Sequence, residues 1–274
     1  MNLNKWPGKN LPSGPTGGDQ RSSHPAPPKE SATKETIKVI FHALLIALVI
    51  RIFFYQPFNI PSGSMKSTLL VGDYLFVSKL SYGYSRHSFP FGLAPFSGRV
   101  FAAEPNRGDV AVFKLPRDGT TDYIKRVIGM PGDEIEMRSG ILFINGRSVP
   151  KQRVDDFIAM EEDGVVRSTP RYRETLPNGV SYLVLDAEPR GAFDNVGPYK
   201  VPGGHYFMLG DNRDNSTDSR ALYHVGFIPF ENFIGRADFM FFSAAIDEGR
   251  RCSLFNPLTW PGCIRWGRIF TVIR

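Results

Sequence analysis

An apolar run near the N-terminus constrains this chain more than any other feature. Residues Lys38 to Tyr55 read K-V-I-F-H-A-L-L-I-A-L-V-I-R-I-F-F-Y. A helix needs about 20 mostly apolar residues to cross a bilayer, and Arg51 lies close enough to the end of the run to reach the head groups. The alternatives are a buried core helix and a cleaved signal sequence, but residues 56–60 offer no small-residue cleavage site. The sequence therefore predicts an uncleaved transmembrane anchor over residues 36–56.

The charges on either side of this anchor predict its orientation. The stretch from Gln56 to Met65 carries no basic residue, whereas six basic residues precede or begin the run: Lys5, Lys9, Arg21, Lys29, Lys34 and Lys38. The positive-inside rule places the N-terminus in the cytoplasm and the remaining chain outside. In a bacterium this is a single-pass protein of the inner membrane with a periplasmic domain. Residues 1–35 are rich in Pro, Gly, Ser and charge, so a disordered cytoplasmic tail is expected there.

Charge and cysteine usage narrow the partners and the compartment. The formal net charge of +6 fits contact with anionic membrane lipid, although scattered charges of both signs also fit an ordinary solvated surface. No basic helix or aromatic RNA-binding stretch is present, so no nucleic-acid partner is expected. Cys252 and Cys263 are the two cysteines. Outside the cytoplasm they could close a short disulfide loop, with two buried thiols as the alternative, and their spacing predicts no metal site.

Beyond the anchor, the pattern is typical of β-strands. Short apolar runs are bounded by turn signals; they are Tyr74–Val77, Val110–Phe113, Tyr123–Ile128, Ile141–Ile144 and Tyr206–Leu209. Ile141 to Val149 reads as a hairpin through Asn145-Gly146, and no long amphipathic helical pattern follows residue 56. We expect a mainly β fold, with an antiparallel β catalytic core in a periplasmic domain of residues 57–274. The polar, turn-rich stretch at about 134–200 is expected to be a β-rich insertion.

Two aromatic segments are candidates for contact with lipid. The first is the loop Phe89–Phe101, which contains two prolines, and the second is the C-terminal tail with Trp260, Trp266 and Phe270. Their aromatic content beside a single anchor motivates this hypothesis. Packing of the loop on the core is the alternative.

Small hydroxyl residues follow the anchor at once, in the segment Pro61-Ser62-Gly63-Ser64-Met65. A serine attacks a carbonyl only if a neighbouring group takes its proton. His24 and His42 lie in the tail and the anchor, but a triad using one of His87, His205 and His224 stays open, because triads are recognised by geometry.

A lysine can also act as the base if burial lowers its pKa and leaves it neutral. Lys125 lies in the apolar run that begins at Tyr123. Alternation places Lys125 and Arg126 on opposite faces of this strand and does not say which of them points inward. On composition alone, the rival lysines are Lys66, Lys79 and Lys114.

The segment Gly210–Arg220 reads G-D-N-R-D-N-S-T-D-S-R and is the densest polar stretch. It lacks the glycine and glutamate of an EF-hand calcium loop. Two interpretations remain: a solvated turn, or a buried network in which Asp218 pairs with Arg220 and holds Ser216 in place.

Four segments together resemble the bacterial type I signal peptidases, which are Ser-Lys dyad serine proteases. They are Pro61–Met65 after an anchor, Arg107–Lys114, Asp122–Asp133 and Gly210–Arg220, in that family's order. Many relatives have two anchors, whereas one is found here. The resemblance implies a mostly β catalytic core with a variable insertion.

The resemblance also implies a role for each matching residue. Ser64 matches the nucleophile and Lys125 the general base; Ser62 matches the hydroxyl that forms the oxyanion hole with the backbone N–H of Ser64. Ser216 matches a serine that orients the lysine amine, and Asp218 and Arg220 match a supporting ion pair.

The implied function is removal of signal peptides from secretory pre-proteins, after small residues of the Ala-x-Ala type, through an acyl-enzyme. We expect a monomer that uses no metal and no cofactor. Two alternatives remain: a specialised Ser-Lys peptidase for a pilin or conjugation factor, and a non-catalytic membrane-tethered module.

Overall fold

The structure is a computed structural model that describes residues 32–89, 96–160, 165–188, 190–245 and 260–273. The expected disordered tail lies almost wholly outside these residues, as do Cys252 and the middle of the aromatic loop.

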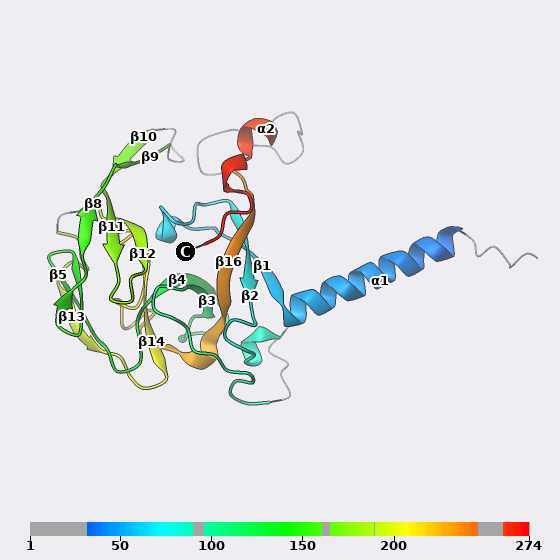
Figure 1. Cartoon of the computed structure of the whole chain (residues 1–274), viewed down its shortest axis with the longest axis horizontal. Helices are drawn as coiled ribbons and strands as arrows, with labels where there is room; N and C mark the ends of the chain where they lie inside the picture. Colours follow the sequence, from blue (N-terminus) through cyan, green and yellow to red (C-terminus); the bar gives the residue numbers. More distant parts are fainter. Residues whose placement is uncertain (1–31, 90–95, 161–164, 189, 246–259, 274) are drawn as a thin grey trace, which may run out of the picture. The chain divides into compact units, whose positions relative to one another are not determined.

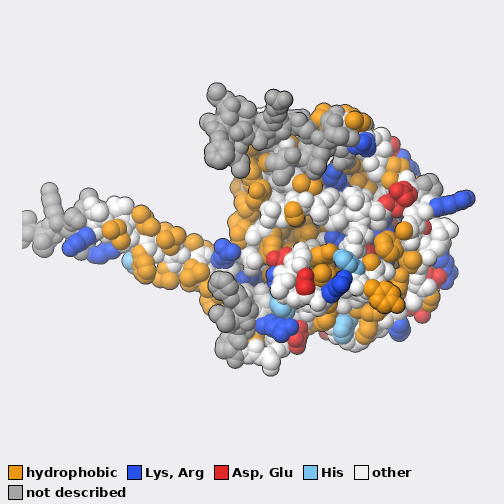
Figure 2. Space-filling model, turned by 180° about the vertical axis from the view of Figure 1, so that it is seen from behind, with side chains coloured by type: hydrophobic (Ala, Val, Ile, Leu, Met, Phe, Trp, Pro, Cys, Tyr) orange, Lys and Arg blue, Asp and Glu red, His pale blue; other side chains and the backbone are white. Residues whose placement is uncertain are grey.

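The N-terminal helix α1 spans Ala32–Phe53 and is long and apolar enough to cross a membrane. It begins four residues before the expected anchor and ends three residues before residue 56, because Tyr55 and Gln56 already belong to strand β1 (Tyr55–Asn59). Figure 2 shows hydrophobic side chains along the visible face of this helix, with Lys and Arg side chains at either end. A helix of this length spans roughly 30 Å, which matches the hydrocarbon core of a bilayer.

A seven-stranded antiparallel sheet forms the main part of the fold. Its order is β1-β2-β16-β3-β4-β14-β15, so the long strand β16 lies between two strands made much earlier (Figure 1). The strands that follow β1 in the chain are β2 (Asp73–Ser78), β3 (Val110–Lys114), β4 (Asp122–Gly129), β14 (His205–Leu209), β15 (Ile228–Pro229) and β16 (Phe233–Ser243). The expected mainly β, antiparallel fold is confirmed, and each predicted apolar run in this sheet lies within a strand.

The segment expected to be an insertion builds three smaller antiparallel sheets, ordered β13-β5-β6-β7, β12-β11-β8 and β10-β9. Their strands are β5 (Glu134–Arg138), β6 (Ile141–Ile144), β7 (Arg147–Ser148), β8 (Lys151–Arg153), β9 (Phe157–Met160), β10 (Val166–Thr169), β11 (Arg171–Thr175), β12 (Ser181–Leu185) and β13 (Val196–Lys200). The predicted hairpin is confirmed: Ile144 pairs with Arg147, and Asn145 and Gly146 have φ angles of 52° and 74°. Positive φ at both central residues is what a type I′ turn requires.

These smaller sheets share a hydrophobic core with the main sheet. Ile128 of β4 and Phe207 of β14 pack with Ile135, Leu142 and Val184 from the segment 134–200. All five side chains are at most 1% exposed, and burial of each one stabilises the fold by about 1.5–3 kcal/mol. Ile128 and Phe207 are therefore packed against the smaller sheets as well as lying in the main sheet.

The C-terminal end of the chain carries a disulfide-bonded cysteine. After β16 come a short helix α2 (Trp260–Cys263) and a 3₁₀ helix (Trp266–Arg268). Cys263 is disulfide-bonded, and its expected partner, Cys252, lies outside the described residues. Trp266 and Phe270 are 63% and 75% exposed, so their expected contact with lipid stays a prediction.

Candidate active site

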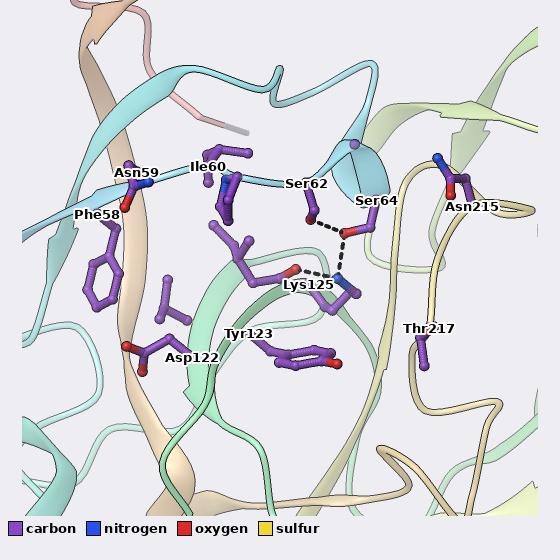
Figure 3. Close-up of a pocket in the computed structure, with 14 residues that line it drawn as sticks. Phe58, Asn59, Ile60, Ser62, Ser64, Asp122, Tyr123, Lys125, Asn215 and Thr217 are labelled. Carbon is purple, nitrogen blue, oxygen red and sulfur yellow. Dashed lines mark hydrogen bonds between the residues drawn. The ribbon is translucent and has the colours of Figure 1, made fainter. Parts of the chain in front are cut away.

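Ser64 and Lys125 come together in the folded chain, although 61 residues separate them. Ser64 lies in a 3₁₀ helix, Gly63–Met65, that follows β1, and Lys125 projects from β4. The Lys125 Nζ lies 2.7 Å from the Ser64 Oγ (Figure 3). This distance allows a proton to pass directly between the two groups.

The environment of Lys125 raises the neutral fraction of its amine relative to that of an exposed lysine. The side chain is 4% exposed, and its Nζ also donates a hydrogen bond to the backbone carbonyl of Ile124 at 3.0 Å. Burial lowers the pKa of Lys125 to about 8, although the negative charges of Asp218 and Asp211 oppose this shift. With this pKa, roughly a tenth of the amine is neutral at pH 7, far more than for an ordinary lysine, and a general base must be neutral.

Two extended segments face each other across a cavity of about 390 Å³ beside Ser64. One segment runs from Phe58 to Ser64, and the other is the start of β4 from Asp122 to Lys125 (Figure 3). The Ser62 Oγ lies in this cavity, 3.4 Å from the Ser64 Oγ. The chain thus brings two hydroxyls and one amine to one end of a groove.

The start of β4 offers a free backbone edge to this groove. β3 pairs with β4 from Asp122 onward, whereas β14 pairs with it between Arg126 and Gly129. On the side opposite β3, no strand of the described chain pairs with Asp122–Ile124. An extended peptide can add to such an edge through main-chain hydrogen bonds.

The polar loop Gly210–Arg220 is a buried network rather than a solvated turn. The Asp218 carboxylate accepts two hydrogen bonds from the Arg220 guanidinium, each of 2.9 Å, and another from the Gly210 N–H at 3.0 Å. Both partners of this pair are almost fully buried. The ion pair expected from the sequence is therefore present.

Ser216 is buried in the same loop, but its hydroxyl has no hydrogen-bond partner among the described residues. Burial raises the pKa of the Asp218 carboxyl, but Arg220 and, to a smaller extent, the nearby Ser216 lower it. The net effect is a lowered pKa. The expected hydrogen bond from Ser216 to the Lys125 amine stays a prediction. Gly210 makes room here, because a Cβ on it would lie 2.1 Å from the Ser216 Oγ and 2.7 Å from the Ser64 carbonyl oxygen.

Sequence reasoning missed Asn212, which holds the serine segment. Its backbone N–H donates to the Ser64 carbonyl at 3.0 Å, and its side-chain Nδ2 donates to the Gly63 carbonyl at the same distance. Asparagine is common in polar loops, so nothing in the local sequence distinguishes this residue. Its contacts span 149 residues of the chain.

A second missed contact stabilises Arg126, the neighbour of the lysine. Its guanidinium forms two hydrogen bonds with the Asp211 carboxylate, at 2.9 and 2.6 Å, and is fully buried. It also stacks over the Tyr182 ring, 4.3 Å from the centroid. Lys125 and Arg126 therefore both point into the protein, one to Ser64 and the other to the polar loop.

The polar loop is also fixed to the smaller sheets of segment 134–200 through Arg213. Its guanidinium makes a two-pronged ion pair with Glu174 of β11, at 2.9 and 2.5 Å. The Tyr182 hydroxyl of β12 donates to the same carboxylate at 2.8 Å. All three residues are buried. The chain around Asp218 thus depends on residues that sequence reasoning assigned to an insertion.

Among the described residues, the rival histidines and the rival lysines Lys79 and Lys114 form no hydrogen bond with the Ser64 hydroxyl. Among the described residues, no histidine forms a hydrogen bond with its hydroxyl: His87 bonds to Arg86, and His205 bonds to a backbone carbonyl. Lys79 and Lys114 line a different cavity. The geometry therefore favours a Ser-Lys pair over a Ser-His-Asp triad.

Comparison with known proteins decides the family. The sequence model described as "Signal peptidase, peptidase S26" matches residues 33–242. The chain belongs to the S26 signal peptidase family. Its activity is therefore that of a serine endopeptidase that removes signal peptides.

Two relatives of similar sequence agree with this family. The signal peptidase I of Rickettsia typhi is 43% identical over 255 residues, which cover 87% of this chain and 94% of that protein. The signal peptidase I of Rickettsia prowazekii is 43% identical over 240 residues, which cover 83% and 89%. A crystal structure of a signal peptidase I from Enterococcus faecalis is 28% identical and covers 49% of this chain and 97% of that one, with a TM-score of 0.28.

Proposed function

We propose that this signal peptidase cuts through a Ser64/Lys125 dyad and an acyl-enzyme. The distance of 2.7 Å between the Lys125 Nζ and the Ser64 Oγ carries this proposal. The neutral amine takes the serine proton, Oγ bonds to the scissile carbonyl carbon, and the amine then gives the proton to the leaving amino group. Water, activated by the same lysine, hydrolyses the ester and releases the new carboxylate.

Ser62 and the backbone N–H of Ser64 are the proposed oxyanion hole. Support comes from the position of the Ser62 hydroxyl in the cavity, close to the Ser64 Oγ. Donors placed where negative charge develops are among the largest contributions to acyl transfer. Ser216, Asp218 and Arg220 are proposed as positioning residues that act through the lysine.

The groove supports cleavage after small residues, as in Ala-x-Ala. The cavity is modest at about 390 Å³, and its lining beside Ser64 and Lys125 is apolar, with Phe58, Ile60, Val112 and Ile124. An extended peptide that adds to the edge of β4 would present alternate side chains to this lining. The proposed preference for alanine follows the specificity of the family, and this apolar lining suits its methyl group.

For location, we propose a single-pass protein of the bacterial inner membrane, with a cytoplasmic N-terminus and a periplasmic catalytic domain. The basic residues before α1 support this orientation. So does the disulfide at Cys263, because disulfides persist in oxidising compartments.

The decisive experiment is cleavage of a purified secretory pre-protein in detergent. Wild type is compared with Ser64→Ala and Lys125→Ala, and the product N-terminus is read by mass spectrometry. We expect one cut after Ala-x-Ala in the wild type and a loss of at least about 10³-fold in turnover in either variant. Activity retained by a folded Lys125→Ala protein would rule out the dyad, and a cut at another motif would rule out the proposed specificity.

A further inference from the structure

A basic cavity of about 690 Å³ lies apart from the active site, at the end of α1. Its cationic lining comes from Arg51 in the last turn of α1, Lys79, Arg86 and Lys114, with His87 beside them. A single carboxylate, Asp118, is found among its described lining residues. The catalytic mechanism uses none of these side chains.

Three of the four basic side chains of this cavity lack an acidic partner among the described residues, and the fourth, Lys114, pairs with Asp122. Within the described residues, Arg51, Lys79 and Arg86 form no ion pair. The Asp118 carboxylate is already engaged, because it accepts the backbone N–H groups of Thr120 and Thr121 at 2.8 and 2.9 Å. The cavity therefore has a surplus of positive charge that an anion would compensate.

The excess positive charge of the cavity affects the pKa of Lys79. Its side chain is 2% exposed, and its Nζ donates hydrogen bonds to the carbonyls of Ile52 and Ser88. Burial, followed by the charge of Arg51, lowers the pKa of Lys79 to about 8. A buried amine beside another cation is unfavourable unless a negative group is present.

The position of Arg51 in α1 indicates how deep the basic cavity lies relative to the membrane. The helix is just long enough to cross the hydrocarbon core, and Arg51 lies in its last turn. A basic side chain at that position lies at the level of the lipid head groups. The hydrogen bond from Lys79 to the Ile52 carbonyl places the cavity at the same level.

A second cavity beside the basic one is apolar and holds about 540 Å³. Its lining consists of apolar and aromatic side chains, including Phe53, Leu80, Tyr84 and Phe101, and it shares Phe89 with the basic cavity. Leu80 and Phe101 are 52% and 83% exposed. A basic cavity beside an apolar one suits an amphipathic ligand, which would occupy both. Free phosphate would occupy the basic cavity alone.

We propose that the basic cavity binds the phosphate of an anionic glycerophospholipid, and that the neighbouring apolar cavity takes part of its acyl chain. The site is separate from the catalytic residues and does not depend on their assigned roles. Lys114 connects the two regions, because it lines the basic cavity and pairs at 2.7 Å with Asp122, which lines the substrate groove. A bound lipid would hold the β3–β4 hairpin, and with it Lys125, at a fixed depth relative to the membrane.

The test is lipid binding to the full-length protein in detergent, measured by native mass spectrometry. The probes are phosphatidylglycerol, phosphatidylcholine, glycerol 3-phosphate and inorganic phosphate. Wild type is compared with Arg51→Glu/Arg86→Glu and with a control of equal charge change, Arg147→Glu/Arg173→Glu, at two exposed arginines of the insertion. Cleavage of a pre-protein in detergent checks that each variant is folded.

We expect one tightly held phosphatidylglycerol on the wild type, and affinity at least about 30-fold weaker in the cavity variant, from the loss of two cations at a bilayer surface. The control should bind like the wild type, and Leu80→Asn should also weaken phosphatidylglycerol binding. Equal loss in both double variants would overturn the site, since attraction would then follow net charge alone. Competition by inorganic phosphate at equal concentration, or equal binding of phosphatidylcholine, would overturn the anionic lipid as its ligand.

Discussion

At the scale of single residues, the proposed dyad predicts that burial of Lys125 sets the pH dependence of cleavage. The lysine acts as a base only when neutral, so the rate should rise with pH through about 8, the pKa that burial gives this amine. The negative charge of Asp218 raises the pKa of Lys125. Asp218→Asn should therefore move the acid limb, the part of the pH–rate profile where the rate rises with pH, to lower pH. The control Asp156→Asn, at a partly exposed carboxylate of segment 134–200, should leave the limb in place. A pH–rate profile of kcat/KM measures both, and an unmoved limb in Asp218→Asn would contradict this electrostatic account.

Ser62 permits a second prediction at this scale. Loss of one oxyanion donor costs about 10²–10³-fold in kcat, so Ser62→Ala should lower kcat by that factor with little change in KM. Ser148→Ala, at an exposed serine of β7, should behave as wild type. Single-turnover and steady-state kinetics separate the two parameters, and a change confined to KM would assign Ser62 to substrate binding instead.

The sequence could indicate the base only in part. Alternation could not separate Lys125 from Arg126, because it assumes that one face of the strand is solvated. In the structure both side chains are buried, at 4% and 0% exposed. Resemblance to the family selected Lys125, whereas Asn212 and Glu174 stayed hidden because their contacts join distant parts of the chain.

At the scale of elements, the pair between β11 and the polar loop should matter for stability. Glu174→Gln would leave the buried Arg213 without its counter-charge, which typically costs about 3–5 kcal/mol. The matched control is Glu136→Gln, which breaks an exposed pair with Arg138 and should cost at most about 1 kcal/mol. Thermal unfolding in detergent compares the two variants. Similar small losses of stability in both variants would show that the smaller sheets do not support the loop.

Strand prediction succeeded where apolar runs were short and bounded by turns. The five runs and the Asn145-Gly146 hairpin are all present in the structure. The pattern missed β16, whose sequence F-I-G-R-A-D-F-M-F-F-S does not alternate. A central strand is covered on both faces along much of its length, so period-2 patterning fades. The boundary of α1 was misplaced because apolar residues continue from the helix into β1.

At the scale of the whole molecule, the orientation of the anchor is open to a direct test. The proposed topology predicts that protease added to the outside of spheroplasts digests the catalytic domain, whereas a tag at residue 1 stays protected. The basic residues before α1 are the cause, so replacement of Lys34 and Lys38 by Glu should weaken this preference. Protection of the catalytic domain in intact spheroplasts would contradict the topology.

The central position of β16 has a consequence for how the enzyme is made. The ribosome finishes β2, which follows Ser64, and the β3–β4 hairpin, which carries Lys125, long before residue 233 is synthesised. β2 and β3 join one sheet only through β16. A nascent chain therefore cannot complete the sheet that positions Ser64 and Lys125 until β16 has been made, and each new copy should stay inert until then.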